Sequence, residues 1–167
     1  MSTKDKIYVA FDGDKDIQYY NLLKGWNNND NLNFSINDAH DINTARDTST
    51  EEQIKRQLKE RFLHSKSFIL LLGESTKYLY KFVKWEIETA LELELPIIVV
   101  NLNKKRIVDN DRCPSVLKDC LTIHISYEMK IIEYAINKWP IVHYKYFKEE
   151  MKSPFTYKNE VYIKLGL

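Results

Sequence analysis

The chain has 167 residues, of which 44% are hydrophobic and 29% charged, and its formal net charge is +1. This length suits one domain with a hydrophobic core of its own, and the near balance of charge gives no support for wrapping nucleic acid or binding an anionic membrane. The first residues hold no apolar stretch of signal-peptide length, and the longest apolar run, residues 68–72, is too short to cross a bilayer, so we expect a cytoplasmic protein.

Apolar runs alternate along the chain with segments of helical spacing. The predicted strands cover residues 6–11, 32–36, 67–72, 96–102 and 121–126. The predicted helices cover residues 16–26, 49–65, 81–95 and 128–139. In the second helix Ser49 and Glu52 form an expected capping box, and the last helix is expected to end before Pro140.

The order of these elements predicts the fold. The third and fourth strands are unbroken apolar blocks, typical of strands that helices cover on both faces. Strand and helix in alternation then predict an α/β domain over residues 1–139, a doubly wound parallel sheet of five strands in flavodoxin-like order. Residues 140–167 form a C-terminal extension in which "VYIKL" predicts an added strand or half of a hairpin. We expect the extension to cover a sheet edge or a helix, with a self-association surface as the alternative.

The cysteines and histidines give no metal-binding pattern. Cys113 and Cys120 lie seven positions apart, which fits neither a redox pair nor a zinc knuckle, and the four histidines are scattered. We therefore expect two free thiols and no metal site.

Ligands of doubly wound sheets bind outside the carboxyl ends of the strands, so the loops after the first four strands form the candidate site. The chain has no GxxxxGK[ST] and no GxGxxG, which excludes a P-loop and a Rossmann dinucleotide site. The third strand ends in "LLLGES", without the aspartate of a phosphate-accepting receiver. No GxSxG motif is present to support nucleophilic hydrolysis.

One carboxylate of the third predicted helix stands on the apolar side. Val83 and Ile87 mark the buried face, and Glu86 projects beside them rather than among the charged residues. Glu86 lies in the first turn, where the helix dipole favours a negative charge. Spacing alone leaves two alternatives, a carboxylate that faces a ligand and an ordinary first-turn acid paired with Lys81 or Arg46.

Three stretches together resemble a TIR domain, specifically the TIR-like class of bacterial Thoeris anti-phage systems. They read "IYVAFDGDKD", "FSINDAHDINTARDTSTEEQIKRQLKERFLHSK" and "FILLLGESTKYLYKFVKWEIETALELELPIIVVNLN". The resemblance covers about residues 6–139 and implies the flavodoxin-like fold. Many such domains cleave NAD at the nicotinamide glycosidic bond.

The resemblance also implies site residues. The catalytic glutamate of the family pattern falls on Glu86, the loop serine on Ser75, and the aromatic residue one turn before the glutamate on Phe82. Tryptophan often fills that aromatic position, and here Trp85 follows three residues later, so either ring is a candidate for stacking on nicotinamide. The loop after the second strand corresponds to one that closes over the site or contacts a neighbour in TIR assemblies. The remaining expected substrate-binding residues are Phe11, Asp12, Gly13, Asp38 and Arg46, with Lys77 as a further cation.

The resemblance implies an NAD glycohydrolase or ADP-ribosyl cyclase whose product, an ADP-ribose-type nucleotide in cyclic form, signals to a separate nucleotide-sensing effector. NAD is then the substrate, no other cofactor is expected, and homo-oligomer formation stays open. A non-catalytic TIR-type interaction module is the main alternative. A nucleoside deoxyribosyltransferase-like enzyme shares the fold and a glutamate, but resembles the chain less in its first two motif regions.

Overall fold

The computed structural model describes residues 5–28, 34–37 and 50–167. Its sheet has six strands in the order β2-β1-β3-β4-β5-β6, and each neighbouring pair is parallel. The first five strands follow the flavodoxin-like order, so the predicted fold class is confirmed, and the sixth is an addition beside β5. The strands are β1 (Asp5–Ala10), β2 (Phe34–Asn37), β3 (Ser67–Leu72), β4 (Ile97–Asn101), β5 (Thr122–Ser126) and β6 (Pro154–Thr156).

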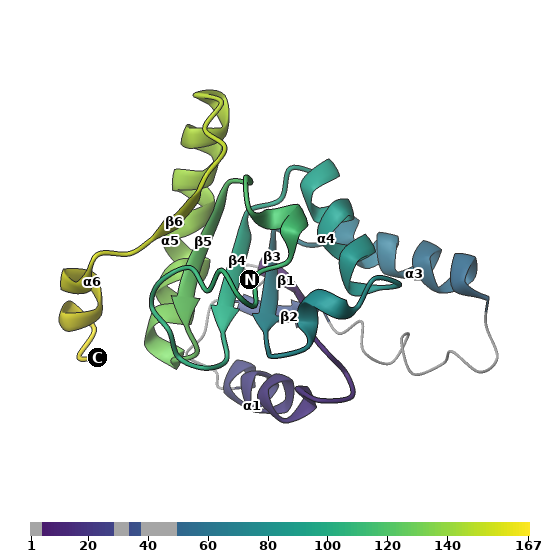
Figure 1. The fold of residues 1–167 in the computed structure, drawn as a ribbon, viewed down its shortest axis with the longest axis horizontal. Coiled ribbons are helices and arrows are strands. Elements are labelled where there is room, and N and C mark those ends of the chain that lie inside the picture. The colour runs from purple at the N-terminus through teal and green to yellow at the C-terminus, as the bar shows by residue number, and fades with distance from the viewer. Residues whose placement is uncertain (1–4, 29–33, 38–49) are drawn as a thin grey trace, which may run out of the picture.

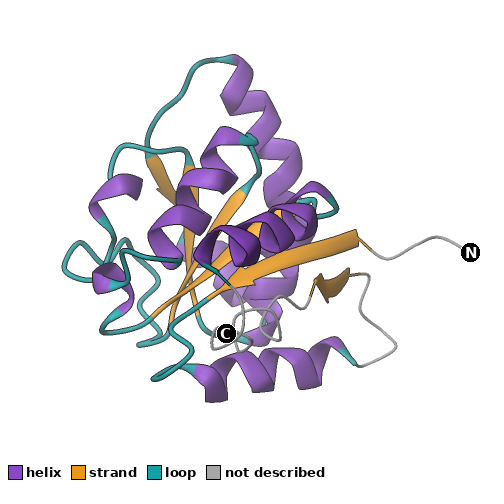
Figure 2. Ribbon diagram, turned by 90° about the vertical axis from the view of Figure 1, so that its right-hand side faces the viewer, coloured by secondary structure: helices purple, strands orange, loops and turns teal. Residues whose placement is uncertain are grey.

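Helices cover both faces of this sheet (Figures 1 and 2). They are α1 (Ile17–Asn27), α3 (Glu51–Leu63), α4 (Val83–Glu92), α5 (Met129–Lys148) and α6 (Asn159–Lys164), with short 3-10 helices η2 (Thr76–Tyr78) and η3 (Ser115–Leu117). Leu23 of α1 and Ile132 of α5 belong to the core on one face, whereas Leu58 of α3 and Ile87 of α4 belong to the core on the other. Every residue of β3 and β4 is buried, which explains their unbroken apolar sequence.

The capping box of α3 lies one residue later than predicted. Thr50 is the N-cap: its hydroxyl accepts a hydrogen bond from the backbone N–H of Gln53, and the Gln53 side chain accepts one from the N–H of Thr50. The predicted pair was Ser49 and Glu52, and Ser49 lies outside the described residues. Both registers satisfy the sequence rule, and the predicted buried residues Ile54, Leu58 and Phe62 are buried in the structure.

The predicted end of the last long helix at Pro140 is wrong. Helix α5 continues through this proline to Lys148. A proline inside a helix costs about 3 kcal/mol. Packing outweighs that cost because Ile132, Ile136 and Trp139 before the proline and His143 after it are buried along one face. Figure 1 shows α5 projecting past the sheet before the chain turns back along it.

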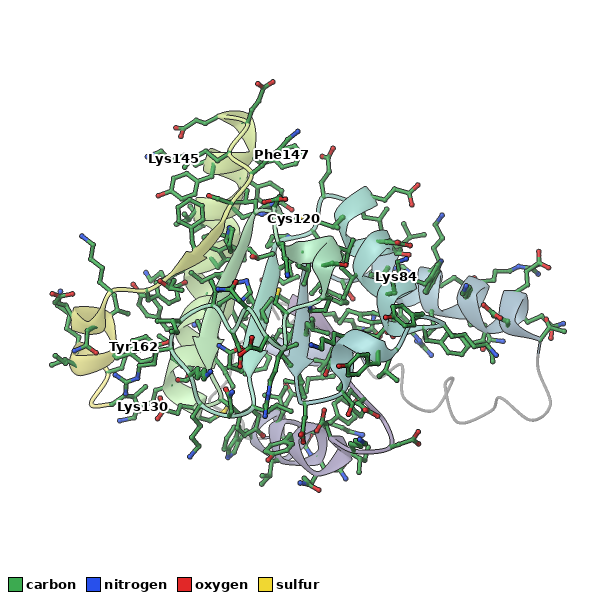
Figure 3. All side chains as sticks on the ribbon, in the orientation of Figure 1. Lys84, Cys120, Lys130, Lys145, Phe147 and Tyr162 are labelled. Atoms are coloured by element: carbon green, nitrogen blue, oxygen red, sulfur yellow. The ribbon has the colours of Figure 1, made fainter. Side chains whose placement is uncertain are left out.

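The C-terminal extension lies beside the strand β5, through other residues than the predicted ones. Pro154–Thr156 forms β6 beside β5, and "VYIKL" is not a strand because most of it lies in α6. A segment this short also fits little more than one helical turn, and in the structure its buried residue is Tyr162. Tyr162 points from α6 toward the rest of the domain (Figure 3). The division of the chain at position 139 stays a prediction.

Within the described part of the chain, no helix has both the length and the apolar character needed to cross a bilayer.

Candidate functional site

The loops that leave β1 and β3 lie side by side, because these strands are parallel neighbours in the centre of the sheet. The chain after β1 enters α1 on one face, and the chain after β3 enters α4 on the other. This reversal is the switch point at which doubly wound folds bind their ligands. Most of the described candidate residues occupy these two loops and the start of α4.

Asp12 organises the loop after β1. Its side chain is 4% exposed, and its Oδ1 accepts hydrogen bonds from the backbone N–H groups of Asp14 and Lys15, at 3.0 and 3.3 Å. Such an Asx-type turn is a common way to order a polar loop. The Asp12 carboxylate therefore binds its own loop. The backbone N–H groups of Asp14 and Lys15 already donate hydrogen bonds to it.

A lysine–serine contact joins the two loops. The Lys15 ammonium donates a hydrogen bond to Ser75 Oγ at 2.8 Å; Lys15 is exposed and Ser75 half-buried. Lys77, the further expected cation, donates from its ammonium to the backbone carbonyl of Asp111 at 2.5 Å. Lys15 was not predicted as a site residue, although it is the only cation in the sequence "FDGDKD".

Asp16 packs against Gly73 beneath this contact. The residue is 7% exposed, and its Oδ2 has no hydrogen-bond partner in the part of the chain that the structure describes. Burial, and then the charge of Asp12, raise the pKa of Asp16 above its ordinary value, while Arg112 and Lys15 act in the opposite direction. Between the exit loops of β1 and β3 there is therefore a carboxyl group held largely away from water.

Glu86 lies deeper, between α4 and the sheet. It belongs to the first turn of α4, its backbone N–H donates to the Phe82 carbonyl at 2.7 Å, and its residue is 3% exposed. The Tyr8 hydroxyl donates a short hydrogen bond, 2.5 Å, to Glu86 Oε2. Burial, and then the charge of Glu86, raise the pKa of Tyr8 well above its ordinary value, so this phenol keeps its proton.

Aromatic rings surround this pair. The Tyr8 ring stacks on Phe62 with centroids 3.8 Å apart, and Phe62 meets Trp85 edge to face at 6.1 Å. Phe82 is 6% exposed and belongs to the same core cluster, whereas Trp85 is half-buried. Of the two rings considered for stacking on nicotinamide, Trp85 is the one with exposed surface.

Basic groups border the outer side of these rings. The Lys55 ammonium lies 5.6 Å from the centre of the Trp85 ring, and Lys81 lies 5.5 Å from that of Phe82. Both ammonium groups also lie within salt-bridge distance of the Glu51 carboxylate. Of the two basic partners considered for Glu86, Lys81 lies 3.8 Å from the Glu51 carboxylate, and Arg46 lies outside the described residues.

A hollow on the adjoining side of α4 does not include Glu86. Its walls come from the η2–α4 segment and from η3, among them Lys77, Tyr80, Val83 and Lys84. Lys84 lies on α4 in Figure 3. The structure thus places the predicted residues in two groups, a polar group at the strand ends (Asp12, Gly13 and Ser75) and a second group at the start of α4 (Phe82 and Glu86, both buried, and the half-buried Trp85).

Three predicted residues fall elsewhere. Phe11 is half-buried and stacks on Tyr20, 4.4 Å away, on the α1 face of the sheet. Asp38 and Arg46 lie outside the described residues. Tyr8, which contacts Glu86 directly, was missed because a tyrosine in an apolar strand resembles any core residue.

Comparison with known families gives one match. The model of the family described as "Thoeris protein ThsB, TIR-like domain" matches residues 8–107. The matched segment runs from Tyr8 in β1 through α4 and β4, and so contains both groups of candidate residues. No curated protein matches the chain.

Proposed function

The chain belongs to the family of Thoeris ThsB TIR-like domains, and we propose that it is an enzyme that cleaves NAD between nicotinamide and ribose. Membership in the family supports a TIR-type role in defence. The cleavage itself is our proposal, and so is its product, an ADP-ribose-type nucleotide in cyclic form that a separate effector senses.

The observation that carries the proposal is the buried Glu86. A carboxylate loses much of its hydration when it is 3% exposed, and such a group is rarely kept without a partner or a task. Among the described contacts, the Tyr8 hydroxyl donates a hydrogen bond to this carboxylate. A buried carboxylate among aromatic rings is suited to a site that meets positive charge during a reaction.

NAD supplies that positive charge. When the bond between C1′ and the pyridinium nitrogen breaks, both electrons go to the nitrogen and nicotinamide leaves as a neutral molecule, so no general acid is needed. Positive charge develops on the ribosyl C1′ and its ring oxygen. Glu86 is proposed to stabilise this centre, as carboxylates do in glycosidases. The half-buried Trp85 is the proposed platform for the cationic nicotinamide ring.

The ribosyl centre is then captured by one of two nucleophiles. Water gives ADP-ribose and releases a proton. An adenine nitrogen or a hydroxyl of the same molecule gives a cyclic isomer, which is favoured when water is excluded. Lys15 and Ser75 at the strand ends are proposed to contact the polar part of the substrate, because a lysine ammonium there can pair with a phosphate.

The burial of Glu86 also requires an opening step. Substrate can touch a carboxylate that is 3% exposed only after side chains over it have moved, so the enzyme is expected to react slowly until an activator or partner favours the open arrangement. The same burial favours the alternative of a non-catalytic interaction module, in which Glu86 is only a buried polar group.

One assay separates the two functions. Purified full-length chain is incubated with NAD, alone and with lysate of phage-infected cells, and nicotinamide release is followed by chromatography while mass spectrometry identifies the nucleotide product. Release by wild type that is lost in Glu86→Gln supports the enzyme. No release under any of these conditions supports the interaction module.

A further inference from the structure

Tyr8 offers a rigid contact to the proposed catalytic carboxylate. It lies in β1, between β2 and β3, with Asn37 and Phe68 as its neighbours in register. Its side chain is fully buried and its ring stacks on Phe62 with the two planes inclined by 13°. A ring clamped in this way can rotate little, so the position of its hydroxyl is fixed by the sheet.

The Glu86 carboxylate, by contrast, stands at the end of a longer unbranched side chain in the first turn of α4. We propose that Tyr8 is a positioning residue, whose hydroxyl fixes the orientation of the Glu86 carboxylate toward the ribose of NAD. This role rests on the function proposed above. Tyr8 contacts Oε2, and a hydrogen bond at one carboxylate oxygen restricts rotation about the last bond of the side chain, so it also fixes where Oε1 points.

The direction of the hydrogen bond supports this role. A phenol whose pKa lies well above its ordinary value stays protonated wherever the protein works, so it donates to the carboxylate and does not take a proton from it. Donation to the charged form favours an ionised Glu86, which is the form that can stabilise an oxocarbenium-like centre.

Packing alone does not account for the hydroxyl. A phenylalanine at position 8 would keep the stacking on Phe62 and the contact with Phe68, which involve only the ring. Burial also desolvates the Glu86 carboxylate, and that cost offsets much of what a hydrogen bond to it contributes to stability. The pair is therefore better explained by what it does to Glu86.

The test compares Tyr8→Phe with Tyr127→Phe in the full-length chain. Tyr127 is buried on the opposite face of the sheet, and its hydroxyl donates to the Tyr19 carbonyl at 2.7 Å. Each substitution removes one buried phenol hydrogen bond and keeps the ring. Nicotinamide release is measured over a range of NAD concentrations, so that kcat and KM are obtained separately.

Positioning predicts that Tyr8→Phe lowers kcat by about 10- to 100-fold while KM changes by less than about threefold, and that Tyr127→Phe leaves both unchanged. An unchanged or raised kcat in Tyr8→Phe, or an equal loss in both variants, would overturn the role of Tyr8 while the proposed function stands. An inactive wild type would overturn the proposed function, and the role of Tyr8 with it.

Discussion

Gly73→Ala introduces a side chain where the structure has no space for one. The added Cβ would lie 2.1 Å from Asp16 Oδ2 and 2.8 Å from its Cγ. The backbone of Gly73 is not in the left-handed region, so space alone opposes the substitution. Asp16 is 7% exposed and has little room to turn away, so we expect the overpacking to lower the free energy of unfolding by about 1–3 kcal/mol.

Urea unfolding tests whether the clash with Asp16 causes this loss, by comparing Gly73→Ala in the wild-type chain and in the Asp16→Ala variant. In the wild-type background the full loss is expected, whereas after Asp16→Ala the methyl group has space and the loss should fall below about 0.5 kcal/mol. Asp16 makes no side-chain capping hydrogen bond to α1, so its removal leaves that helix start unchanged in this respect. An equal loss in both backgrounds would refute the assignment of the clash to the Asp16 carboxyl group.

Two further predictions concern stability. Burial, and then the charge of Asp12, raise the pKa of Asp16 above its ordinary value of 3.8. The Asp16 carboxyl group therefore holds its proton more tightly in the folded state than in the unfolded state. Ionisation of Asp16 then lowers the stability of the folded state as the pH rises above 3.8. Asp16→Asn should therefore gain stability relative to wild type in urea unfolding at about pH 7 but not at about pH 3, and an equal difference at both would contradict the buried carboxylate. Tyr162→Ala, which removes a fully buried ring under Arg106, should lower the free energy of unfolding by about 3–5 kcal/mol, and a loss below about 1 kcal/mol would show that α6 is not part of the core.

The sheet could be predicted from the sequence because its strands are short apolar blocks with polar boundaries. The predicted strand at residues 67–72 has the bounds of β3, and the others differ from the observed strands by at most two residues at either end. The structure of the C-terminal part could not be predicted from the sequence, because local sequence rules conflict there. Pro140 signals a helix end, yet buried residues continue on one face of α5 to His143, and packing decides.

The candidate site was predictable only in part. The apolar-side position of Glu86 followed from helical spacing, and its burial on α4 bears that out. Its hydrogen bond with Tyr8 joins residues 78 positions apart, and no local pattern of residues signals a contact of that kind. The role of Lys15 likewise depends on the parallel pairing of β1 and β3, which brings their exit loops together.

The negative charge at position 86 is tested most directly by the rate of nicotinamide release from NAD in Glu86→Gln, with Glu92→Gln as the control. Glu92 is an exposed glutamate of the same helix, so the two variants make the same chemical change in different environments. We predict that Glu86→Gln still binds NAD but releases nicotinamide at least about 100-fold more slowly, while Glu92→Gln matches wild type. Release by Glu86→Gln at the wild-type rate would contradict a catalytic role for this carboxylate.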